Sequence, residues 1–122
     1  MSKKIINGDV DLESLYLESL PDFLVDVHIS GSFDCRGNNL HSLEGAPKSV
    51  GGSVSCSINN LQSLEGAPKS VGGNFYCSTN NLQSLEGAPK NVGGYFYCRN
   101  NPVKFTEKQV RAVCDVKGKV YV

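Results

Sequence analysis

The sequence repeats itself every 21 residues, and no other feature limits the possible folds as strongly. The segment Val-Gly-Gly-Ser-Val-Ser-Cys starts at Val50 and returns with small changes at Val71 and Val92. Each copy follows the same six residues, Leu-Glu-Gly-Ala-Pro-Lys. A unit this short cannot bury its apolar side alone, so successive units stack and share one continuous core. The repeat therefore predicts a solenoid.

Looser copies extend the repeat to both sides. The order apolar-x-Gly-x-apolar-x-apolar begins again at Ile6, Ile29 and Val116. The length of 122 residues suits one domain, and an aromatic content of only 8% indicates a thin core that a repeat must organise. We expect a single domain of about six rungs over 1–122, with N-terminal cap repeats over 1–34, three regular repeats over 35–98 and a C-terminal cap over 99–122.

Each rung contains alternating apolar residues, which predict a short strand, and stacked strands make a parallel sheet. Mostly irregular turns are expected in the remainder of each rung. Thr106-Glu107-Lys108-Gln109 fits a capping box and predicts a short helix before the last strand. The six strands are expected to centre near Val10, Phe33, Val54, Phe75, Phe96 and Val120.

Two columns of identical residues have structural explanations. The second glycine of the Gly-Gly pair is present in all six rungs, which indicates either a positive φ or a close approach of neighbouring backbones. An asparagine follows three residues after each rung cysteine, and its amide is expected to pair with turn backbone that no strand reaches. These asparagines are Asn38, Asn59, Asn80 and Asn101.

The order Cys-x-x-Asn-x-Leu-x-x-Leu, from Cys56 to Leu64, resembles the leucine-rich repeat, with Cys where Leu is usual. More narrowly, Ser-Leu-Glu-Gly-Ala-Pro-Lys-x-Val-Gly-Gly-x-Phe-x-Cys is similar to small leucine-rich-repeat proteins of tailed bacteriophages and some bacteria. This resemblance implies a parallel sheet on a concave face and turns on a convex face. It also implies that a partner could be a host or defence protein, with the chain acting in the host cytoplasm.

Charge and cysteine content exclude several classes of function. Twelve basic and twelve acidic residues give a formal charge of zero, so overall attraction to nucleic acid or anionic lipid does not select the partner. Five cysteines without a secretory signal or Cys-x-x-Cys motif are expected to be reduced core residues rather than disulfides or zinc ligands. We expect a cytoplasmic protein with no membrane span, metal or cofactor.

No nucleophile can be paired with a base, and the Gly-Gly pairs lack the Lys-Ser/Thr of a phosphate loop. The chain is therefore expected not to be an enzyme. Function is expected on the outward strand positions, which change along the stack from acidic, through small and polar, to aromatic and basic. Tyrosine and arginine are enriched in binding hot spots. The expected partner-binding patch consists of Tyr76, Tyr95, Tyr97, Arg99, Lys119 and Tyr121.

The chain is polarised in charge. Residues 1–34 contain two lysines and seven acidic residues, for a net charge of −5, and residues 98–122 contain six basic and two acidic residues, for +4. Three hypotheses follow. The first is a protein-binding module, the second is nucleic-acid or nucleotide binding at the basic C-terminal end, and the third is a structural protein assembling head to tail. A monomer or weak head-to-tail association is expected.

Overall fold

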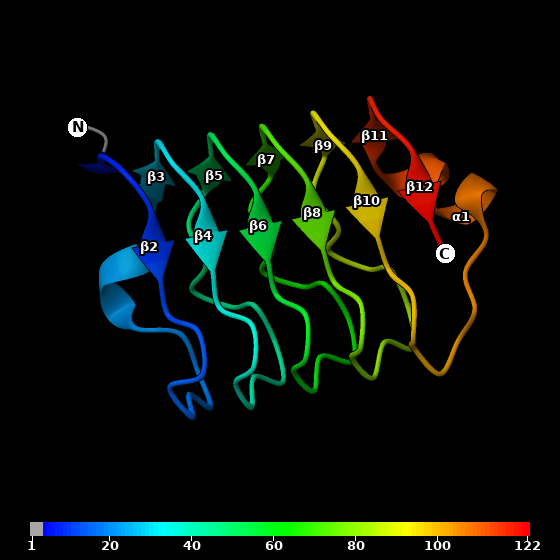
Figure 1. Cartoon of the computed structure of the whole chain (residues 1–122), viewed down its shortest axis with the longest axis horizontal. Coiled ribbons are helices and arrows are strands. Elements are labelled where there is room, and N and C mark those ends of the chain that lie inside the picture. Colours follow the sequence, from blue (N-terminus) through cyan, green and yellow to red (C-terminus); the bar gives the residue numbers. More distant parts are fainter. Residues whose placement is uncertain (1–3) are drawn as a thin grey trace.

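The computed structural model describes residues 4–122 as a stack of six turns, each with two short strands on either side of a corner (Figure 1). All strand pairs are parallel, and the strands form two six-stranded sheets. The first sheet contains β1 (Lys4–Ile6), β3 (Val27–Ile29), β5 (Ser49–Val50), β7 (Ser70–Val71), β9 (Asn91–Val92) and β11 (Asp115–Val116). The second contains β2 (Val10–Asp11), β4 (Phe33–Asp34), β6 (Val54–Ser55), β8 (Phe75–Tyr76), β10 (Phe96–Tyr97) and β12 (Val120–Tyr121).

The solenoid of six turns is confirmed, and each expected strand centre lies in a strand of the second sheet. The first sheet is an addition that the sequence pattern did not predict. The chain turns at Gly51 and Gly52, so Val50 belongs to a strand of its own, β5, and Val54 belongs to β6. Each turn therefore contributes one strand to each sheet.

Backbone hydrogen bonds at the corner set the spacing between turns. The Gly72 amide donates to Val50 O (2.9 Å) and the Gly73 amide donates to Gly52 O (2.8 Å). We call the two acceptors of each turn its corner carbonyls. The second glycine is required by close approach, because a Cβ on Gly73 would lie 3.0 Å from the Gly52 carbonyl carbon. Of the six second glycines, Gly8 has a positive φ, of 100°.

The core runs the length of the stack. Phe33, Phe75 and Phe96 point inward from the second sheet and are almost completely buried. The rung cysteines Cys35, Cys56, Cys77 and Cys98 form a buried column of free thiols beside them. Burial raises the pKa of Cys35 to about 12, with a further contribution from Asp34, and raises that of Cys98 to about 11. The cysteines are therefore neutral core residues, as expected from the sequence.

The asparagine column joins successive turns as predicted. Asn80 Nδ2 donates to Cys56 O (3.0 Å) and to Cys77 O (3.2 Å), and its Oδ1 accepts the Leu61 amide (3.1 Å). Asn38, Asn59 and Asn101 repeat the arrangement, and Asn59 is the most buried of the four polar side chains.

Two short helical segments lie near the ends of the stack. The 3₁₀ helix η1 (Asp22–Leu24) precedes β3, and the α-helix α1 (Glu107–Val113) precedes β11 (Figure 1). The predicted capping box is present, because Thr106 Oγ1 accepts the Gln109 amide and Gln109 Oε1 accepts the Thr106 amide. Val110 packs α1 onto the core and is completely buried. Over residues 4–122, no helix has the length and apolar composition needed to cross a bilayer.

Candidate functional site

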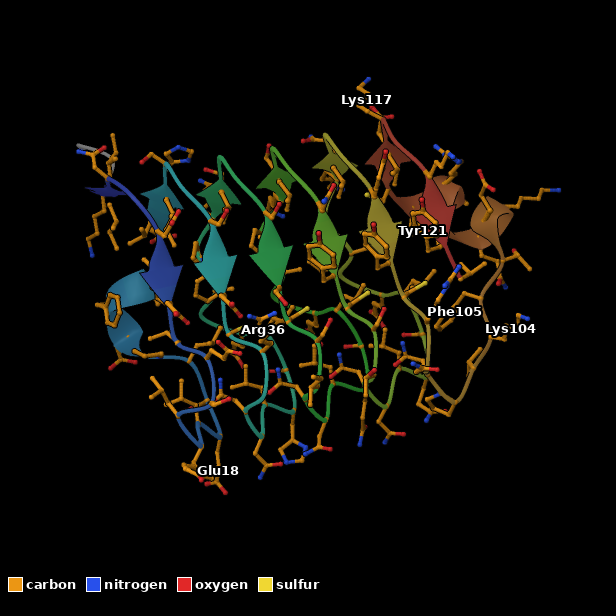
Figure 2. All side chains as sticks on the ribbon, viewed as in Figure 1. Glu18, Arg36, Lys104, Phe105, Lys117 and Tyr121 are labelled. Atoms are coloured by element: carbon orange, nitrogen blue, oxygen red, sulfur yellow. The ribbon has the colours of Figure 1, made fainter. Side chains whose placement is uncertain are left out.

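Four tyrosines gather on the outward side of the second sheet, at its C-terminal half. The rings of Tyr76, Tyr97 and Tyr121 form a parallel stack, with centroid separations of 4.8 Å and 4.6 Å. Tyr95 meets Tyr97 and Tyr121 edge-on, at 6.2 Å and 5.8 Å. We call these four rings, together with Arg99 and Lys119, the tyrosine face; Figure 2 labels Tyr121 on its outermost strand.

The repeat itself places these rings together. Tyr97 of β10 is in register with Tyr76 of β8 on one side and with Tyr121 of β12 on the other. Adjacent parallel strands lie about 4.8 Å apart, which falls within the range of centroid separations at which aromatic rings pair. Asn74 Nδ2 also donates to the Tyr76 hydroxyl (2.9 Å). The tyrosines are thus fixed by a hydrogen-bonded sheet before any partner arrives.

Because the rings are stacked, only some of their atoms remain accessible to a partner. Tyr97 is sandwiched between Tyr76 and Tyr121, so both of its faces are covered and its edge and hydroxyl point outward. Partial burial, together with the neighbouring tyrosines, raises the pKa of the Tyr97 phenol. The phenol is therefore protonated at neutral pH and can donate a hydrogen bond.

Arg99 supplies a positive charge next to the rings. Its Cζ lies 5.3 Å from the centre of the Tyr121 ring, in cation–π range. Arg36 occupies the equivalent position three turns earlier, where it pairs with Glu13 (2.9 Å) and Asp34 (3.3 Å). Among residues 4–122, neither Arg99 nor Lys119 has a carboxylate within 4.0 Å. The tyrosine face therefore carries two uncompensated positive charges, whereas Arg36 is neutralised.

The acidic end of the same sheet contains a cluster of carboxylates. Oxygens of Asp11, Glu13 and Asp34 lie within 4.8 Å of one another, a spacing that could suit a metal ion. Arg36 already lies against two of the three, and the hydrogen bond to Glu13, followed by the charge of Asp34, raises the pKa of its guanidinium. The cluster is thus an ion-pair network in which Asp11, Glu13 and Arg36 are exposed and Asp34 is half-buried.

A column of polar side chains on the same sheet has a structural role that the sequence analysis missed. Ser53 Oγ accepts the Asn74 amide (2.9 Å), and Asn74 Oδ1 accepts the Tyr95 amide (2.8 Å). Asp9 and Ser32 accept amides of the following turns in the same way. The signal was present, because four successive turns carry a side chain with an acceptor oxygen at this position.

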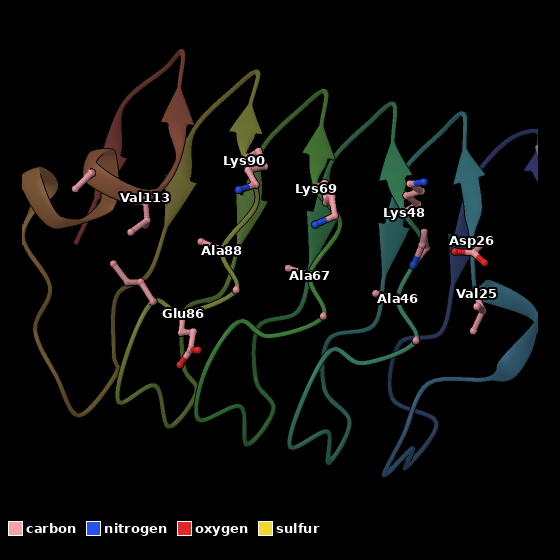
Figure 3. Close-up of a pocket in the computed structure, with 16 residues that line it drawn as sticks. Val25, Asp26, Ala46, Lys48, Ala67, Lys69, Glu86, Ala88, Lys90 and Val113 are labelled. Carbon is pink, nitrogen blue, oxygen red and sulfur yellow. The ribbon is translucent and has the colours of Figure 1, made fainter.

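A groove of about 780 Å³ runs along another side of the stack, across three turns (Figure 3). Its lining repeats with the sequence: Ala46, Ala67 and Ala88 alternate with the lysines Lys48, Lys69 and Lys90. Asp26 lies near Lys48, whereas Glu86 lies on the opposite side of the alanine row from the lysines, and Val25 and Val113 lie at the two ends of the groove. The sequence reasoning treated this segment only as a scaffold.

One serine and one histidine are hydrogen-bonded in the first sheet. His28 Nδ1 lies 2.6 Å from Ser49 Oγ, across the β3–β5 pair. A nucleophile and base also need a group that orients the histidine, and over residues 4–122 no carboxylate hydrogen-bonds to His28. The pair is a cross-strand contact that joins two turns.

Comparison with known proteins finds no family model, curated protein or solved structure that matches the chain. Any function must therefore be argued from the arrangement of its own residues.

Proposed function

We propose that the chain is a non-enzymatic binding module and that a partner protein docks on the tyrosine face. The observation that supports this most directly is the contiguous packing of four tyrosines beside an uncompensated Arg99. Tyrosine and arginine are the residue types most enriched in interface hot spots. The rings are held by the sheet, so little side-chain entropy is lost when a partner binds.

The chemistry of the face indicates an acidic contact on the partner. Arg99 and Lys119 lack carboxylate partners among residues 4–122, and the Tyr97 hydroxyl is a donor at neutral pH. A partner carboxylate placed here would accept from both kinds of group, and charge-assisted hydrogen bonds are the stronger ones. We therefore expect the partner to present an Asp or Glu to Arg99.

Nucleic-acid binding is the alternative, and the ring geometry argues against its usual mode. Proteins that bind single strands stack bases on the faces of aromatic side chains. The faces of Tyr97 are already covered by Tyr76 and Tyr121, so a base cannot stack there without breaking the ring column. Phosphate contacts to Arg99 and Lys119 would remain, and these would weaken steeply with salt.

We also propose, on the resemblance of the repeat alone, that the solenoid is a leucine-rich-repeat variant from a tailed phage or a bacterium. In that setting the partner is a host or defence protein in the host cytoplasm. The amino-acid sequence of the repeat from Ser63 to Cys77 supports this proposal.

The test uses Tyr97→Ala against Ser55→Ala, a change on the same face and at the equivalent strand position two turns earlier. A pull-down with the tagged chain, with and without nuclease, supplies a partner, and calorimetry then measures affinity. We expect Tyr97→Ala to weaken binding about 30-fold, the equivalent of about 2 kcal/mol, and Ser55→Ala to have no effect. Unchanged affinity of Tyr97→Ala would exclude the tyrosine face, and capture that nuclease abolishes would favour nucleic acid.

A further inference from the structure

The side chain of Arg111 binds the backbone of the last turn. Its Nη1 donates to Val116 O (2.7 Å) and its Nη2 donates to Gly118 O (2.8 Å). Its Nε donates to Glu107 Oε2 (2.9 Å), one helical turn earlier on α1. All three kinds of guanidinium nitrogen are therefore engaged, and the side chain is held across the end of the first sheet.

The two acceptors are the corner carbonyls of the sixth turn. In the fifth turn the corner carbonyls are Val92 O and Gly94 O, which accept the amides of Lys117 (3.0 Å) and Gly118 (2.9 Å). The same two bonds join every earlier pair of turns. Arg111 thus supplies, with two side-chain nitrogens, the two donors that a following turn would supply with its backbone.

A matching substitution is present at the other end of the stack. The Gly8 amide, which occupies the position of a corner donor, bonds to Ser30 Oγ (2.8 Å). The regular turns have Gly51, Gly72 and Gly93 where Ser30 stands, so they lack this hydroxyl. Side chains therefore occupy both corner carbonyls at the C-terminal end of the described stack and one corner donor, the Gly8 amide, at its N-terminal end.

We propose that Arg111 closes a docking site for a second copy of this chain, and that its departure lets the C-terminal turn of one copy bind the N-terminal turn of another. Charge complementarity selects this occupant, because residues 1–34 carry a net charge of −5 and residues 98–122 carry +4. If Gly8 of the second copy takes the place that a glycine of a seventh turn would have beside Gly118, then Asp9 of the second copy lies beside Lys119 of the first. Asp11 of the second copy then lies beside Tyr121 of the first. A contact between two identical ends would instead bring like charges together.

Sedimentation velocity over a wide range of protein concentration tests the proposal. The parent chain is expected to sediment as one species at all concentrations, whereas Arg111→Ala is expected to form larger species as concentration rises. Lys108→Ala, which removes a positive charge from the same helix, is the control and should behave like the parent. Adding Lys119→Glu to Arg111→Ala should restore the single species, because this substitution places a negative charge beside Asp9 of the second copy.

Three results would overturn the proposal: self-association of the parent, a folded but monomeric Arg111→Ala, or oligomers of Arg111→Ala that persist with Lys119→Glu. Circular dichroism establishes whether each variant is folded. If Arg111→Ala does not fold, Arg111→Lys decides the question, since a lysine keeps the charge but reaches only one carbonyl. Arg111→Lys should self-associate, and a folded, monomeric Arg111→Lys would then refute the inference.

Discussion

At the scale of single residues, side chains add to the backbone hydrogen bonds that join neighbouring turns. Each strand of the second sheet has two residues, so the ladder provides few hydrogen bonds per turn. Asn80 adds bonds to three backbone groups in two neighbouring turns. Leaving such groups unpaired costs more than the bonds themselves contribute.

Replacement of Asn80 by alanine should therefore destabilise the solenoid by about 1 to 3 kcal/mol. Asn81 is exposed and lies next to it in sequence, so Asn81→Ala is the control and should have little effect. Urea denaturation of both variants measures the difference in free energy of unfolding. Equal and small losses for the two variants would show that the asparagine column does not hold the turns together.

The serine column gives a second matched pair. Ser53 Oγ accepts the Asn74 amide, whereas Ser55, two residues later on the same face, makes no side-chain hydrogen bond among residues 4–122. Ser53→Ala should lower the free energy of unfolding by about 1 kcal/mol, and Ser55→Ala should leave it unchanged. Thermal and urea unfolding followed by circular dichroism provide the measurement. A larger loss for Ser55→Ala would contradict the assignment.

The sequence was informative about single residues whose role follows from their spacing along the chain. The asparagine column, the capping box at Thr106 and the outward tyrosines were all predicted from spacing. The role of Arg111 was not, because it depends on where α1 lies relative to the corner of the last turn. Likewise the Ser53 hydroxyl accepts the amide of the next turn, a contact that spacing alone does not reveal.

At the scale of elements, the corner is the part that spacing did not resolve. Apolar residues such as Val50 and Val54 lie on either side of each Gly-Gly pair, and their spacing does not show that they belong to two different strands. The Gly-Gly pair allows the chain to turn, and the turn separates β5 from β6. The result is two sheets where one was expected. The corner carbonyls also form two rows along the stack, and Arg111 donates to the last carbonyl of each row.

At the scale of the whole molecule, the buried cysteine column couples stability to alkaline pH. Burial, followed by the neighbouring thiols, raises the pKa of Cys77 well above its ordinary value of 9.0. Above pH 9 the unfolded chain loses this proton and the folded chain keeps it. The folded state then binds more protons than the unfolded state, so stability falls as pH rises.

Cys77→Ala should therefore change the pH dependence of unfolding. Between about pH 9 and 11, the free energy of unfolding of the parent should fall more steeply than that of the variant, by about 1.4 kcal/mol per pH unit. Urea denaturation at a series of pH values measures both curves, and the comparison cancels the ionisation of lysines and tyrosines that the two proteins share. Parallel curves would mean that the Cys77 thiol ionises equally well in the folded chain.

The stacked tyrosines also give the molecule an optical property. The chain has no tryptophan, and four of its five tyrosines belong to the tyrosine face. The fifth, Tyr16, lies near the N-terminus and is 93% exposed. Rings that lie parallel at 4.6 to 4.8 Å couple their electronic transitions. The near-ultraviolet circular dichroism and the fluorescence of the unlabelled protein therefore come mainly from the surface proposed to meet a partner, so docking can be followed directly by spectroscopy.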